Sequence, residues 1–95
     1  MNKTAKLKAS KIIVAAEIVD SKRIQNLKTY MESKVKAVAL GDSTFEIDPE
    51  TMKVEWKDLL EEVEKVIDLR SDCAWIWRFD AAKNELLRTK ISSQP

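Results

Sequence analysis

Histidine is absent from this 95-residue chain, which also has only one cysteine, one glycine and two prolines. Without histidine, the chain lacks the commonest general base and the commonest zinc ligand. Cys73 has no catalytic partner to make it a thiolate, so we expect a small, buried strand residue. A single glycine cannot build a phosphate-binding loop. The sequence therefore predicts neither an enzyme nor a cofactor or metal site.

Long apolar runs are missing as well. The longest one is interrupted by Glu17 and is far shorter than the roughly 20 residues that span a membrane. The basic start, MNKTAKLKASK, is not followed by the cleavage site of a secretory signal. A lone cysteine forms no internal disulfide, so nothing favours an oxidising compartment. We expect a cytoplasmic protein, with Glu17 at a strand end or edge or paired with a lysine.

Excess charge is small, at a net +1, but it is unevenly distributed. Residues 1–40 carry nine basic and three acidic side chains, whereas residues 41–95 carry eight basic and thirteen acidic ones. The asymmetry suggests a polar surface for a partner, although two solvated faces that merely differ in sign give the same pattern. The length predicts a single small domain over residues 1–95, with frayed ends near 1–8 and 92–95.

The first half of the chain predicts a strand followed by a helix. Residues 11–19, KIIVAAEIV, are β-branched and apolar, as in a strand covered on both faces, and a helix is the alternative. Residues 20–41 predict a helix that Asp20 or Ser21 caps and the left-handed Gly41 ends. Its apolar stripe consists of Ile24, Leu27, Met31, Val35 and Val38. In the alternative, the helix stops near Ser33 and VKAVAL forms a strand.

The second half predicts two hairpins separated by a helix. Residues 43–56 alternate about the turn Asp48-Pro49-Glu50-Thr51, with Phe45 and Ile47 on one strand and Val54 and Trp56 on the other. Residues 56–72 have the clearest helical stripe, and Asp58 with Glu61 resembles a capping box. Residues 73–80 and 84–91 form the second hairpin across AAKN.

This order of elements indicates an α+β domain. Strand, helix, strand, strand, helix, strand, strand (βαββαββ) fits a mainly antiparallel sheet with two helices on one face. The first six elements follow the split-βαβ order of a ferredoxin-like domain, and the last strand is an extra C-terminal one.

The stretch CAWIWRFD places Cys73, Trp75, Trp77 and Phe79 on one side of a strand. The opposite side contains Arg78 and Asp80, so the pattern favours the aromatic row as the inner face beneath the helices. If the helices instead cover Ala74 and Ile76, the aromatic row lies on the open side of the sheet and forms a patch for a partner or a homodimer.

Three tryptophans in so short a chain favour a protein-binding module, since tryptophan and arginine are enriched at interface hot spots. The predicted contact residues on the sheet are Trp56, Trp75, Trp77 and Arg78, and Lys22 with Arg23 is an alternative polar site. The partner is another protein or a second copy in a homodimer. Small chains without motifs are typical of phage or mobile-element accessory factors, which act as inhibitors or adaptors by surface occlusion.

Two other functions stay open. A strand bearing aromatics invites comparison with the RNA-recognition motif, but CAWIWRFD lacks its glycines and residues 11–19 lack a second aromatic platform. Nucleic acid would then contact the basic N-terminal region, through Lys3, Lys6, Lys8, Lys11, Lys22 and Arg23. The third function is that of a structural subunit in a homo-oligomer.

Overall fold

The structure is a computed structural model that describes residues 10–92. The predicted frayed N-terminal end, residues 1–8, lies outside the described residues, as do residues 93–95 of the predicted frayed C-terminal end. Five strands and two α-helices follow one another along the chain, and the first helix continues into a π-helical turn, η1. In chain order they are β1 (Lys11–Glu17), α2 (Ser21–Tyr30), η1 (Met31–Val35), β2 (Val38–Ala39), β3 (Thr44–Ile47), α3 (Trp56–Val66), β4 (Cys73–Asp80) and β5 (Glu85–Ile91).

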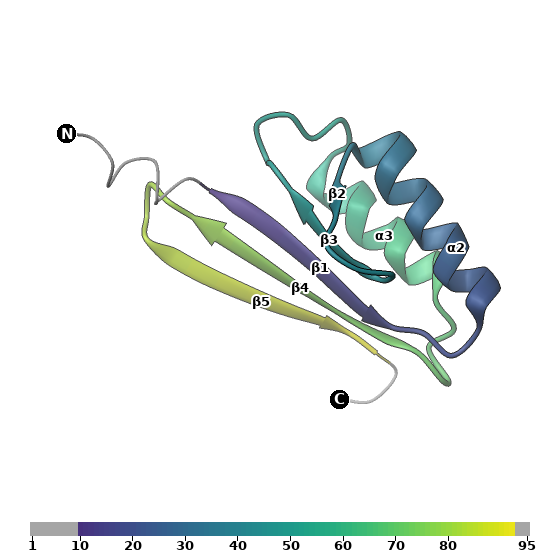
Figure 1. Ribbon diagram of the computed structural model, residues 1–95. Helices are drawn as coiled ribbons and strands as arrows, with labels where there is room; N and C mark the ends of the chain where they lie inside the picture. The colour runs from purple at the N-terminus through teal and green to yellow at the C-terminus, as the bar shows by residue number, and fades with distance from the viewer. Residues whose placement is uncertain (1–9, 93–95) are drawn as a thin grey trace.

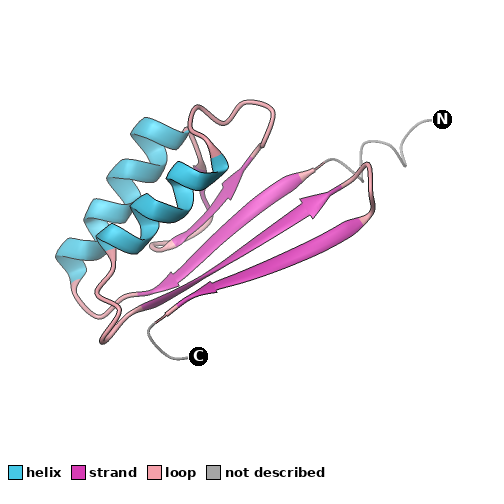
Figure 2. Ribbon diagram, turned by 180° about the vertical axis from the view of Figure 1, so that it is seen from behind, coloured by secondary structure: helices cyan, strands magenta, loops and turns pink. Residues whose placement is uncertain are grey.

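The strands form one antiparallel sheet in the order β2-β3-β1-β4-β5. Both helices lie on the same side of this sheet, and the long β4–β5 hairpin extends past them (Figure 1). The view from behind shows the same two layers, and within residues 10–92 no element covers the second face of the sheet (Figure 2). The predicted α+β class with two helices on one face of an antiparallel sheet is therefore confirmed.

The core lies between the helices and one face of the sheet. Strand β1 alternates as a half-covered strand should, with Ile12, Val14 and Ala16 buried and their neighbours more exposed. The helices contribute a buried stripe to the same layer: Leu27, Met31, Val35, Leu59 and Val63. Because only one face of each strand meets the helices, the prediction that 11–19 is covered on both faces was wrong, whereas the strand itself is confirmed.

The first helix ends earlier than predicted. Asp20 caps it as expected, because its side chain accepts a hydrogen bond from the amide of Lys22 at 2.6 Å. The helix closes through η1 at Lys36, which has a positive φ of 68°. The carbonyl of Met31 accepts hydrogen bonds from the amides of both Lys36 and Ala37 there. Lys36, and not Gly41, is thus the left-handed terminal residue.

The predicted hairpin at 43–56 was wrong in its second strand. Strand β3 is present, but it pairs with the two-residue β2 rather than with residues 53–56. The turn at 48–51 is confirmed, because the carbonyl of Asp48 accepts from the amide of Thr51 at 3.1 Å. Trp56 begins α3 instead of ending a strand, and the N-cap residue Glu55 makes no side-chain capping bond. The predicted capping box of Asp58 and Glu61 is therefore absent.

The remaining elements follow the sequence pattern closely. Helix α3 forms where its stripe predicted it, although it ends at Val66 and not near residue 72, because Ile67 turns to an extended backbone. The hairpin of β4 and β5 is confirmed, and Asn84 in its turn has a positive φ of 53°. Between residues 10 and 92, neither helix has the length and apolar character needed to cross a bilayer.

Candidate docking surface on the open sheet face

The uncovered side of the sheet carries the aromatic row of β4. Ala74 and Ile76 are fully buried under the helices, so Trp75 and Trp77 point the other way and are half-buried. The expectation that the row forms the inner face was therefore wrong. Ala74 pairs with Ala16 and Ile76 with Val14, so small and branched residues from both central strands meet the helices. The bulky indoles are left for the opposite side.

We call this surface the aromatic face. It is made of the side chains that alternate with the core residues along four strands. Its members are Lys11, Ile13, Ala15 and Glu17 on β1; Thr44 and Glu46 on β3; Cys73, Trp75, Trp77 and Phe79 on β4; and Leu86, Arg88 and Lys90 on β5.

The centre of the aromatic face is apolar. In the register of β1 with β4, Ile13 lies beside Trp77 and Ala15 lies beside Trp75. On the other side of β4, the ammonium of Lys90 lies 5.8 Å from the centroid of the Trp75 ring, within cation–π range. A hollow of about 390 Å³ opens there, lined by Trp75, Trp77, Arg88, Thr89 and Lys90. The surface thus combines two indole anchors with adjacent cations.

Charges of opposite sign border this apolar centre. Glu46 on β3 lies on one margin, where the ammonium of Lys11 is 3.6 Å from its carboxylate. Arg88 and Lys90 on the outer strand β5 lie on the other margin, and both are exposed. The face therefore carries Glu46, paired with Lys11, toward β3 and two cations toward β5.

Cys73 lies at one end of the aromatic face and is only half-buried, so the prediction of a buried strand residue was wrong. Partial burial raises the pKa of its thiol, and the negative charge of Glu17, whose Oε1 lies 3.9 Å from the sulfur, raises it further. Glu17 itself is exposed at the last position of β1, as expected for a strand end. The pair holds a protonated thiol and gives it no nucleophilic character.

Trp56 and Arg78 lie on the helix side of the sheet and do not join Trp75 and Trp77. The guanidinium carbon of Arg78 is 4.8 Å from the centroid of the Trp56 ring, a cation–π contact that links β4 to the start of α3. Trp56 also packs against the core. The four sheet residues predicted as one contact site are thus divided between two sides of the molecule.

Arg23 is engaged within the fold. Its Nε donates to the buried carboxylate of Asp72 at 2.8 Å, and that carboxylate also accepts from the backbone amides of Val19 and Asp68. Desolvation acts to raise the pKa of Asp72, but these hydrogen bonds outweigh it and hold the pKa well below its usual range. Arg23 therefore serves to join α2 to the loop before β4.

The residues predicted to form a basic site lie in several places. Lys22 is exposed at the start of α2, whereas Lys11 pairs with Glu46 on the aromatic face. Lys3, Lys6 and Lys8 lie outside the described residues. Contact with nucleic acid through these residues therefore stays a prediction.

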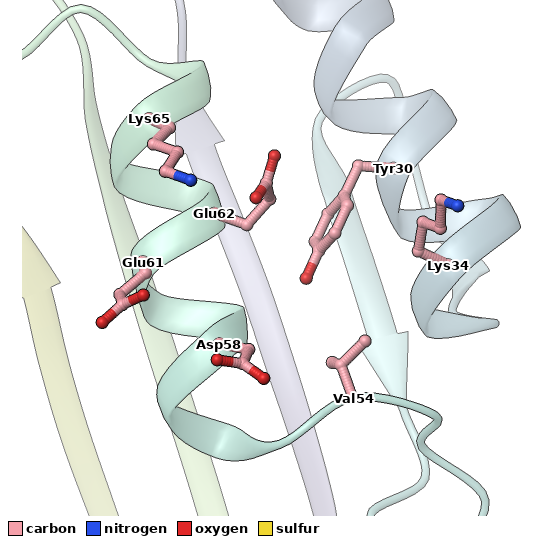
Figure 3. A pocket seen from close by; sticks show the side chains of 7 residues that line it. All are labelled: Tyr30, Lys34, Val54, Asp58, Glu61, Glu62 and Lys65. Carbon is pink, nitrogen blue, oxygen red and sulfur yellow. The ribbon is translucent and has the colours of Figure 1, made fainter.

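A second concave surface lies between the two helices, as Figure 3 shows. This groove of about 340 Å³ is lined by Tyr30, Lys34, Val54, Asp58, Glu61, Glu62 and Lys65. Burial raises the pKa of Tyr30, and the negative charges of Glu62 and Asp58 add to the effect. The part of the chain that the structure describes has no group of three or more cysteine, aspartate or glutamate side chains that could hold a metal ion. With mixed charges and few apolar groups, the groove offers a weaker anchor than the aromatic face.

One signal in the sequence could have identified the exposed side. Ile12, Val14 and Ala16 alternate with Lys11, Ile13, Ala15 and Glu17, and only the second set contains charged residues. The charged set therefore marks the open side of β1, and the antiparallel register then assigns Trp75 and Trp77 to the same side. The alternation of β4 taken alone favoured the opposite assignment.

Comparisons with protein-family models, with curated proteins and with solved structures found no match for this chain.

Proposed function

We propose that this chain is a non-enzymatic protein-recognition module, an inhibitor or adaptor that acts by surface occlusion and docks through its aromatic face. The observation that supports this most is the position of Trp75 and Trp77, which lie on the side of the sheet opposite α2 and α3 (Figure 2). A face of this kind is the usual anatomy of a protein interface, with an apolar aromatic centre and a charged rim.

The physical basis is the free energy released when water leaves the apolar centre. Indole rings already held on a strand have little rotamer entropy left to lose on binding, so most of their buried area contributes to affinity. A contiguous apolar area on a small domain also promotes association. The margins of Arg88, Lys90 and Glu46 then orient the partner.

The proposal extends to architecture and setting. The order β2-β3-β1-β4 supports assignment to the ferredoxin-like arrangement, with β5 as an additional strand at the edge. A single cysteine that forms no internal disulfide supports a cytoplasmic setting, where disulfides are rare.

Two tryptophan variants test the proposal as a matched pair. Trp77→Ala should leave the circular dichroism spectrum of the fold unchanged and abolish capture of the protein partner, because Trp77 lies outside the core. Trp56→Ala should retain capture at low temperature but melt earlier, because Trp56 packs on the core beneath Arg78. Binding is measured with nuclease-treated extract and purified chain.

The reverse pattern would overturn the proposal. A Trp77→Ala variant that is unfolded would show that the indole stabilises the domain, and unchanged capture by a folded variant would show that the aromatic face binds nothing. Capture that disappears with nuclease treatment would indicate nucleic acid as the ligand instead.

A further inference from the structure

We propose that the aromatic face docks on the same face of a second copy of this chain, related by a two-fold axis that runs parallel to the strands above the boundary of β1 and β4. This inference rests on the part of the proposed function that makes the aromatic face a docking surface. A second copy would compete there with any foreign protein. The two sheets would pack face to face as an aligned sandwich, with strands roughly parallel and the helices outermost.

The register of the sheet supplies the argument. One row of side chains crosses the aromatic face in the order Glu46, Ile13, Trp77, Arg88, from β3 to β5. The next row crosses it in the order Thr44, Ala15, Trp75, Lys90. Each row is thus acidic or neutral at one end, apolar in the middle and basic at the other end.

A two-fold axis parallel to the strands reverses the left-to-right order of the side chains in each row. It leaves the position of the row along the strands unchanged. The row of the second copy therefore presents Arg88 opposite Glu46, and Glu46 opposite Arg88. Each dimer gains two such oppositely charged contacts, one on either side of the axis. Glu17, one row farther along β1, lies diagonally near Lys90 of the second copy, whereas Lys11 lies diagonally near Arg88 of that copy. These two weaker contacts have opposite signs and offset each other, so the Glu46–Arg88 contacts carry the electrostatic argument.

The apolar centre is complementary under the same operation. Trp77 of one copy lies opposite Ile13 of the other, and Trp75 lies opposite Ala15, so each large ring meets a smaller aliphatic side chain. Two layers of large rings stacked directly on each other would hold the sheets apart. Large against small instead lets them approach to the roughly 10 Å typical of packed sheets.

The charge arrangement favours a second copy over a partner of a single sign. An acidic partner would approach Arg88, Lys90 and Lys11 but be repelled by Glu46 and Glu17, and a basic partner would meet the opposite difficulty. A footprint four strands wide and about seven residues long covers about 450 Å² per copy in projection. The two copies together would cover about 900 Å², below the roughly 1,200 Å² at which stable interfaces begin, so we expect a weak dimer with a micromolar dissociation constant.

Two charge reversals test the arrangement by mixing. Glu46→Arg alone places two arginine side chains opposite each other at both contacts across the axis, and Arg88→Glu alone places two glutamate side chains there. Sedimentation velocity should show that each variant self-associates at least tenfold more weakly than the wild type. An equimolar mixture should form a heterodimer, because both contacts across the axis then pair opposite charges. A defect in folding would not be repaired by mixing.

The control is Glu64→Arg, the same charge change on the exposed side of α3, which should dimerise like the wild type. A wild-type chain that is monomeric at high micromolar concentration overturns the inference. So does a dimer that survives both reversals, or a mixture that stays monomeric. If the wild type is monomeric while Trp77→Ala still abolishes capture of a different protein, the inference fails and the proposed function stands. If Trp77→Ala changes neither self-association nor capture of another protein, both the inference and the proposed function fail.

Discussion

Ile12 and Ile13 are the same amino acid at neighbouring positions of β1, yet they lie in different environments. Ile12 is 1% exposed beneath the helices, whereas Ile13 lies on the aromatic face beside Trp77. The two side chains differ only in which way the pleat turns them. One face of the sheet therefore contributes to the core, whereas the other carries side chains that the described part of the chain covers only partly.

The two faces also differ in how they accept charge. On the core side, Asp72 is the one buried ionisable residue within 10–92, and its carboxylate is bound by Arg23 and by backbone amides. On the aromatic face, Lys11, Arg88 and Lys90 remain in solvent beside the indoles. Charge is thus tolerated in the core only with full hydrogen bonding, while the open face carries it freely at the margins.

Truncation of the two isoleucines should give the largest difference in the free energy of unfolding between the two faces of the sheet. Ile12→Ala should lower the free energy of unfolding by about 3–4 kcal/mol, because it leaves a cavity in the core. Ile13→Ala should lower it by about 1 kcal/mol, because only part of that side chain is covered. Urea unfolding at a concentration low enough to keep the chain monomeric measures both. Equal losses would mean that the open face is covered within a single copy.

Asp72→Asn should have the next largest effect, about 2 kcal/mol, because it weakens the hydrogen bonds of the buried carboxylate with Arg23 and two amides. The pKa of Asp72 is lowered in the folded state, so its contribution is complete above the unfolded pKa of about 4 and is lost as the pH falls below it. Urea unfolding of wild type and variant should therefore differ at pH 6 and converge toward pH 2. A difference that persists in acid would contradict this.

Truncation of an arginine on either face of the sheet should have the smallest effect on the free energy of unfolding. It tests whether a cation on the helix side contributes more to stability than one on the aromatic face. Arg78→Ala should cost about 0.5–1 kcal/mol, because it removes the cation–π contact with Trp56. Arg88→Ala, on the open face, should change the stability of the monomer by less than about 0.5 kcal/mol. Thermal melts of both variants measure the difference, and an equal cost would show that Arg88 is engaged within the monomer.

Strong local periodicity made several elements predictable. Strand β1 lies where a β-branched apolar run predicted a strand. Helix α3 and the β4–β5 hairpin lie where a helical stripe and alternation predicted them, since a regular pattern commits a whole segment to one structure. Asp20 was predictable as an N-cap because its side chain acts within two residues of itself.

Other features depended on contacts between distant segments. The helix stops at Lys36 although the apolar stripe continues to Val38, because residues 38–39 pair with β3. Trp56 begins α3 although alternation suited a strand, since the helix places its ring against the core beneath Arg78. Neither choice is visible in a local window of sequence.

The site itself was only half predictable. Trp75 and Trp77 were identified as contact candidates from residue type, but the alternation within β4 favoured burying them. Trp56, Arg78 and Arg23 were grouped with the site by composition, and the structure shows each of them engaged within the fold.

By itself the sequence determined the class of fold and the existence of an aromatic row, because periodicity and residue type are local properties. Only the tertiary structure decided which side of the sheet that row occupies. A strand has two equivalent faces until something packs on one of them, and here α2 and α3 packed on Ile12, Val14, Ala74 and Ile76. The tryptophans were left facing outward for that reason.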